Sequence, residues 1–199
     1  MVRKSVVIFG LSLLASFAQP ANATTLTFDN IPGGSIQDVF GDMPAYEGFL
    51  FSSTLDWIDL LLSPWDVGAH SGEFGILNNE GGVGVVNASD GSDFTFDGLW
   101  AKWWPTEPRP AGVNSLFGTL SGYNDGSQVW SVATSLDETY KFYGPQAGSI
   151  DELRLGFGEF FFVDDLLLNE PARVSDSTST LALMIAGGLL GVFVQRWWS

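Results

Sequence analysis

The sequence predicts an all-β fold, an antiparallel β-sandwich, flanked by an N-terminal signal peptide and a C-terminal hydrophobic helix. Residues 24–169 consist of short runs in which apolar and polar side chains alternate, and turn residues separate these runs. Glycine is abundant, with 24 in 199 residues, and no stretch of this region keeps apolar residues at helical spacing over three turns. Many short strands joined by turns favour an antiparallel sandwich over a parallel α/β sheet.

The clearest local signal is a hairpin over residues 115–136. Side chains from Leu116 to Tyr123 alternate between the two faces of a strand, and residues 129–132 bring the chain back. Between them lies Asn124-Asp125-Gly126, a combination that accepts positive φ angles at low cost. The pattern therefore predicts two paired strands joined by a tight turn.

The other segments follow the same rule, with one exception. Further strands are expected at 25–28, 49–52, 83–87, 93–96, 99–103, 139–143, 152–157 and 160–168. The exception is 53–62, where Ser and Thr precede an acidic and apolar stretch, and here the pattern predicts one or two helical turns.

Residues 1–23 have the features of a secretory signal peptide. Arg3 and Lys4 precede a 12-residue apolar run at 6–17, and Ala21-Asn22-Ala23 provides a small-x-small cleavage site. The alternative is an uncleaved anchor, but the run is shorter than the ~20 residues that span a bilayer. We therefore expect an exported chain whose mature domain, residues 24–170, begins near Thr24.

The C-terminal part changes composition. Residues 171–180 are small and polar, as in a linker, and 181–194 are 14 consecutive apolar or glycine residues. Such a helix would span ~21 Å against a hydrocarbon core of ~30 Å. With Arg196 and two terminal tryptophans following it, 181–199 is expected to form a short transmembrane helix; the alternative is a buried element of the domain.

Composition excludes several classes of function. The chain has 23 acidic and 8 basic residues, a net charge of −15, so nucleic-acid binding is not expected. Absence of cysteine removes disulfides, thiol catalysis and zinc–thiolate sites. An exported domain without disulfides must be stabilised by its core or by metal ions.

The C-terminal tail resembles the PEP-CTERM class of sorting signals, in the variant with a Val-Pro-Asp-Ser-Gly motif. The residues that carry this resemblance are Val174, Ser175, Asp176, Ser177, Thr178 and Arg196. Ser175 stands where this variant has proline, and a single arginine stands where a basic cluster is common. The resemblance implies an exosortase-type transpeptidase as partner, transient anchoring in the inner membrane and delivery to the cell surface or the extracellular matrix of a Gram-negative bacterium, in association with exopolysaccharide and biofilm.

The domain resembles those that accompany such tails. The similarity rests on short motifs at 25–29, 96–100, 122–129, 150–153 and 163–166. It implies a jelly-roll sandwich akin to carbohydrate-binding modules.

Three aspartates form a candidate metal site. Asp29 ends the first predicted strand, and Asp164 and Asp165 lie in the last, which commonly runs near the first in such sandwiches. Calcium takes 6–8 oxygen ligands, so a structural Ca²⁺ is one reading and solvated aspartates are the other. Strand alternation predicts that only one of Asp164 and Asp165 faces the site.

Tryptophans provide a candidate ligand site. Trp100 and Trp104 are expected on one face of a strand and Trp103 on the other, so one set belongs to the core. An exposed indole would offer a flat surface for a sugar ring, whereas the alternative places all three in the core.

No motif identifies a catalytic site. The chain has a single histidine, His70, and no Gly-x-Ser-x-Gly sequence. We therefore expect a non-enzymatic binding or structural module, with polysaccharide as a candidate ligand. The alternatives are a secreted glycan hydrolase, which needs only two well-placed carboxylates, and a structural protein without a specific ligand.

Overall fold

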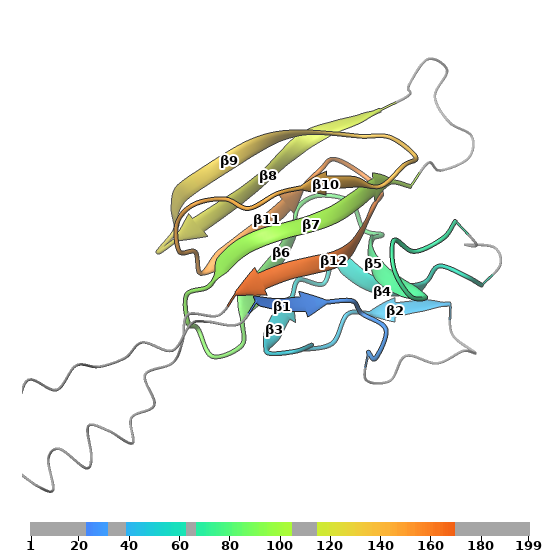
Figure 1. Cartoon of the computed structure of the whole chain (residues 1–199), viewed down its shortest axis with the longest axis horizontal. Coiled ribbons are helices and arrows are strands. Elements are labelled where there is room, and N and C mark those ends of the chain that lie inside the picture. The colour runs from blue at the N-terminus through green and yellow to red at the C-terminus, as the bar shows by residue number, and fades with distance from the viewer. Residues whose placement is uncertain (1–22, 32–38, 63–66, 105–114, 170–199) are drawn as a thin grey trace, which may run out of the picture. The chain divides into compact units, whose positions relative to one another are not determined.

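The computed structural model describes residues 23–31, 39–62, 67–104 and 115–169, which form two antiparallel β-sheets packed face to face (Figure 1). All described strands lie in one compact unit, Ala21–Pro171, which has its own core. Residues 1–22 of the expected signal peptide (1–23), the linker and sorting motif at 171–180, and the tail at 181–199 lie outside the described residues. Within the described ranges there is no helix long and apolar enough to cross a membrane.

The larger sheet has seven strands in the order β10-β7-β12-β5-β4-β2, with β1 pairing the end of β12. Its strands are β1 (Ala23–Leu26), β2 (Phe40–Asp42), β4 (Leu55–Asp59), β5 (Phe74–Asn78), β7 (Thr95–Trp103), β10 (Lys141–Tyr143) and β12 (Phe161–Asn169). The first and last strands lie side by side, as the sequence predicts (Figure 1).

The smaller sheet has five strands in the order β3-β6-β11-β8-β9. These strands are β3 (Phe49–Phe51), β6 (Gly84–Ala88), β8 (Leu116–Asn124), β9 (Ser127–Leu136) and β11 (Glu152–Gly156). The β8–β9 hairpin confirms the strongest local prediction. Its turn places Asp125 at φ 49° and Gly126 at φ 72°, the positive angles that a tight hairpin turn requires.

Side-chain alternation divides the larger sheet into an inner and an outer face. Trp103 and Phe161 belong to the main core between the sheets, whereas their neighbours Trp104 and Phe162 belong to a second cluster on the outer face. This second cluster also contains Ile58, Leu60 and Leu77. The loop that follows β4 begins at Leu60, and its residue Ala69 packs against this outer cluster.

The predicted antiparallel sandwich is confirmed, but individual elements differ. Residues 53–62 form no helical turn: they contain β4, in which Leu55 and Trp57 enter the main core while Ile58 enters the outer cluster. Apolar residues on both faces remove the two-residue period by which strands are recognised. The expected strands at 93–96 and 99–103 form one continuous strand, β7, and β2 and β5 were not predicted.

Candidate functional site

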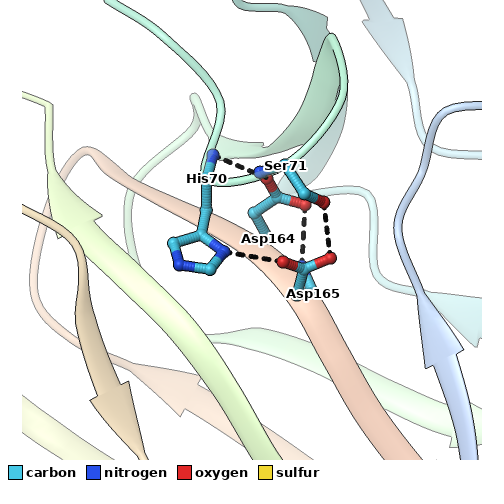
Figure 2. Close-up of polar contacts among 4 residues, drawn as sticks. All are labelled: His70, Ser71, Asp164 and Asp165. Atoms are coloured by element: carbon cyan, nitrogen blue, oxygen red, sulfur yellow. Dashed lines mark hydrogen bonds and ion pairs between the residues drawn. The ribbon is translucent and has the colours of Figure 1, made fainter.

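Residues 67–73, the second described part of the loop between β4 and β5, are held against the larger sheet by aspartates from both ends of the domain. We call them the 67–73 loop. Asp164 Oδ2 accepts hydrogen bonds from the backbone N–H groups of His70 at 2.8 Å and Ser71 at 2.9 Å (Figure 2). Asp29 Oδ1 accepts from the N–H groups of Glu73 at 2.8 Å and Phe74 at 3.3 Å. The carboxylates thus satisfy four backbone donors of one segment.

Asp165 adds side-chain contacts to the same loop. Its Oδ2 lies 2.6 Å from His70 Nδ1, and its Oδ1 accepts a hydrogen bond of 2.6 Å from Ser71 Oγ (Figure 2). The prediction that only one of Asp164 and Asp165 would face this region is wrong. Asp165 has φ 45°, and the pairing of β12 with β7 shifts register between Asp164 and Leu167, so alternation is broken at this point.

Lys102 fixes the beginning of the same loop. Its Nζ donates hydrogen bonds of 2.6 Å and 2.7 Å to the carbonyl oxygens of Val67 and Gly68, and it lies 4.4 Å from the ring centroid of Tyr140. Burial lowers the pKa of Lys102 to about 8, although the charge of nearby Asp164 opposes the shift. Two charged side chains on neighbouring strands, Lys102 and Asp164, therefore bind the backbone of one loop.

Burial also raises the pKa of Asp164 to about 6, and the hydrogen bonds from Ser71 and Asp165 only partly offset that rise. Asp164 is fully buried, so this shifted carboxyl has no access to a substrate. Its perturbed pKa is explained by its structural role.

His70, Ser71 and Asp165 do not form a nucleophilic triad. In such a triad the serine hydroxyl bonds to the histidine ring, and the aspartate holds the other ring nitrogen. Here the serine hydroxyl and the histidine ring both bind Asp165 (Figure 2). The arrangement therefore fixes the loop and does not activate the hydroxyl of Ser71.

The candidate tryptophans occupy three different environments. Trp103 is buried in the main core and Trp104 in the outer cluster, so neither offers an exposed surface. Trp100 is half-buried, and the His70 ring lies flat on it. The predicted orientation of Trp100 and Trp104 opposite to Trp103 is confirmed. The exposed aromatic ring next to Trp100 is that of Phe142, with ring centroids 5.2 Å apart.

The candidate calcium ligands reach the same loop without forming a cluster of ligands. Among the residues that the structure describes, no three acidic or imidazole side chains gather closely enough to hold a metal ion. Backbone N–H groups occupy oxygens of Asp29 and Asp164, where a cation was expected. The geometry gives the calcium hypothesis no support.

A polar pocket lies on the outer face of the five-stranded sheet, with a volume of about 250 Å³. It is lined by Asn87, Ala88, Gly91, Tyr123, Gly126, Asp151, Glu152 and Arg154. We call this site the polar pocket. Asn87, Glu152 and Tyr123 are direct partners across β6, β11 and β8, so they form one row on the sheet.

Contacts within the polar pocket fix its side chains. The Arg154 guanidinium lies 3.9 Å from the Tyr123 ring centroid and binds the carboxylate of Glu152. Asn87 Nδ2 donates a hydrogen bond of 2.8 Å to the carbonyl oxygen of Asp151. Planar polar groups are thus held in defined orientations around a small cavity.

Sequence reasoning missed the polar pocket. The alternation of Glu152, Leu153, Arg154 and Leu155 indicates which side chains of β11 face outward. It does not indicate that β6 and β8 lie on either side of β11, and this pairing creates the row.

Comparisons with known proteins bear on the architecture alone. No family model matches the sequence, and no curated protein matches it either. Among solved structures, the chain is similar to the C-terminal family 22 carbohydrate-binding module of Clostridium thermocellum Xyn10B, at 11% identity and a TM-score of 0.38, over 76% of this chain and 95% of that one. It is also similar to the family 11 carbohydrate-binding module of Clostridium thermocellum, whose structure holds a β-1,3-1,4-mixed-linked tetrasaccharide, at 11% identity and a TM-score of 0.36, over 77% of this chain and 98% of that one.

Proposed function

We propose that residues 24–170 form a non-catalytic glycan-binding module of jelly-roll type, exported to the cell surface or the extracellular matrix. The observation that carries this proposal is the polar pocket on the outer face of the five-stranded sheet. Sugars present hydroxyl groups around a ring, and proteins bind small molecules in concave sites where a few placed polar groups fix orientation. Amide, carboxylate and guanidinium groups beside one aromatic ring provide this chemistry.

The pocket residues favour binding over hydrolysis. A glycosidase places two carboxylates on opposite sides of the scissile bond, about 5–9 Å apart. The two carboxylates that line the polar pocket, Asp151 and Glu152, are consecutive in the chain. Asp151 Oδ2 accepts a hydrogen bond of 3.0 Å from the Asp125 N–H, and Glu152 binds Arg154, so each carboxylate already has a structural partner.

Delivery of this module is the second part of the proposal, and the sequence alone supports it. The signal peptide directs export, and the 181–199 helix holds the chain in the inner membrane while an exosortase-type transpeptidase acts at the motif that begins at Val174. Polysaccharide at the cell surface or in a biofilm matrix is then the expected ligand. Export and sorting in this way bring the polar pocket to the compartment where such glycans occur.

The test is a glycan array with residues 24–173, with and without calcium. We expect binding to at least one glycan class, weakened by Tyr123→Ala, because this change removes the ring on which Arg154 lies while Arg154 holds Glu152 in place. Phe142→Ala is the matched control, since it removes an exposed ring from the other sheet and should leave binding unchanged. Failure of the domain to bind any glycan, with its fold intact by circular dichroism, would refute the proposal.

A further inference from the structure

We infer that the polar pocket binds a single neutral, hydroxyl-rich sugar residue by hydrogen bonds and excludes anionic sugars such as uronates and sulfated residues. This inference rests on the proposed glycan-binding function and specifies the ligand class of the same site. It follows from the size of the pocket, the side-chain groups that have no hydrogen-bond partner within it, and the sign of its charge.

The size of the pocket limits the ligand to about one ring. Its volume is about 250 Å³. Sites for drug-sized molecules measure about 300–1,000 Å³. Gly91 and Gly126 line it without side chains, and a Cβ atom at either position would meet nothing within 4 Å, so these walls are open to solvent. One residue of a longer chain can therefore enter while its neighbours remain outside.

The contacts inside the pocket leave an acceptor oxygen on each of three side chains. Asn87 uses its amide nitrogen on the Asp151 carbonyl, which leaves the side-chain oxygen. Asp151 uses Oδ2 on the Asp125 N–H, and Glu152 uses Oε1 on Arg154, so each keeps a second carboxylate oxygen. These oxygens can accept from sugar hydroxyl groups, and the second N–H of the Asn87 amide and the Nη groups of Arg154 can donate to them. The pocket therefore suits a neutral group that both donates and accepts.

Among the described lining residues the pocket has one cation, Arg154, and its Nε is paired with Glu152. Arg154 binds Glu152, and this hydrogen bond is the main cause that raises its pKa, so the guanidinium keeps its charge. It also covers one face of the Tyr123 ring at 3.9 Å, which removes that face as a stacking surface for a sugar. Recognition therefore depends on hydrogen bonds along the row of Asn87 and Glu152.

The negative charge of the pocket lining and that of the whole domain both disfavour an anionic sugar. Asp151 and Glu152 outnumber Arg154 in the pocket lining by one unit of charge. Across residues 24–173 there are 22 acidic and 5 basic side chains, a difference of −17. A uronate would meet repulsion both during approach and in the pocket, and a neutral sugar would meet neither.

The test compares retention of the 24–173 domain by a neutral mixed-linkage β-glucan and by polygalacturonic acid, in affinity gels at low and high salt. We expect retention by the neutral polymer at both salt concentrations and weaker retention by the acidic one, with the larger difference at low salt, where repulsion is least screened. Glu152→Gln removes one charge and frees Arg154, and should raise affinity for polygalacturonic acid roughly tenfold. Glu159→Gln is the control, because it makes the same change on an exposed residue that does not line the pocket.

The outcomes separate the inference from the proposed function. Retention of the wild-type domain by the acidic polymer at least as strong as by the neutral one would overturn the inference and leave glycan binding intact. An equal gain in Glu152→Gln and Glu159→Gln would assign the exclusion to overall charge and overturn the role of the pocket. Lack of retention by these polymers and by every glycan of the array would overturn the proposed function itself.

Discussion

The imidazole of His70 lies flat on the indole of Trp100, with ring centroids 3.9 Å apart and planes inclined by 16°. The same imidazole contacts Asp165 through Nδ1 and meets the edge of Tyr140, with centroids 5.5 Å apart. The half-buried ring of Trp100, one of three candidate surfaces for a sugar, is thus covered by a residue of the protein itself. The 67–73 loop closes over this part of the larger sheet.

Removing the imidazole should loosen the loop and expose Trp100. We expect His70→Ala to lower the free energy of unfolding by about 1–3 kcal/mol, because the ring stacking and the bond to Asp165 are lost together. Urea unfolding measures this loss, and acrylamide quenching of tryptophan fluorescence reports the exposure. His70→Phe keeps a flat ring without Nδ1 and should restore the protection of Trp100. If quenching is unchanged in His70→Ala, the loop does not depend on this contact.

The pH dependence of stability should carry the signature of Asp164. Burial raises the folded-state pKa to about 6 from an ordinary value of 3.8, so the folded state binds this proton more tightly than the unfolded state does. Burying the ionised carboxylate therefore lowers the free energy of unfolding. This loss of stability is full above pH 6 and decreases as pH falls toward 3.8. Its size is on the order of 2–3 kcal/mol.

Comparison with Asp164→Asn isolates this contribution, because the variant cannot titrate at that position. We expect the unfolding free energy of the wild type, relative to Asp164→Asn, to increase as pH falls from 7 to 5. Urea unfolding at each pH measures the difference. A difference that is independent of pH in this window would show that Asp164 titrates as an ordinary exposed carboxyl group.

Chelation tests the calcium hypothesis directly. Backbone N–H groups already bind oxygens of Asp29 and Asp164, so we expect the melting temperature to remain unchanged when EDTA or Ca²⁺ is added. Thermal unfolding by circular dichroism is the measurement. A melting temperature that rises with calcium, and does so less in Asp29→Asn, would restore the metal site.

A glycine contact tests the packing at the end of the smaller sheet. A Cβ atom at Gly118 in β8 would lie 2.1 Å from the carbonyl oxygen of Gly156 and 2.5 Å from the carbonyl carbon of Phe157. These are backbone atoms that cannot rotate away, so Gly118→Ala should destabilise the domain by about 2–4 kcal/mol. Gly144→Ala is the control, because its Cβ would meet only a ring atom of Phe142 at 3.5 Å. Equal stability of the two variants would contradict the close approach of β8 and β11.

Local patterns predicted most of the strands, and the exceptions have physical reasons. The β8–β9 hairpin has alternation and a turn sequence within one short segment, so its structure is encoded locally. β4 buries apolar residues on both faces, and its strand period is therefore hidden. The period of β5 is hidden in the same way, because Ile76 lies in the main core and Leu77 in the outer cluster.

The site was predicted less completely because it depends on strand order. His70 and Asp165 are 95 residues apart and meet because β12 pairs β5, the strand that follows the 67–73 loop. Alternation placed Trp100 and Trp103 on opposite faces correctly. It failed at Asp165, where a positive φ angle breaks the two-residue period. Rules based on ideal strands do not include such irregularities.

Processing at both ends of the chain is the prediction on which the proposed itinerary depends. In a Gram-negative host with an exosortase-type transpeptidase, the exported protein should begin at Thr24 and end within 171–180, the small and polar linker that holds the sorting motif. Mass spectrometry of the surface and medium fractions gives both ends. Replacing Asp176 and Ser177 together by alanine should leave the 181–199 tail attached and the protein in the membrane fraction. A tail that is retained in the unmodified protein, or removed equally in a host without the transpeptidase, would refute exosortase sorting and leave the glycan-binding proposal to be judged on its own test.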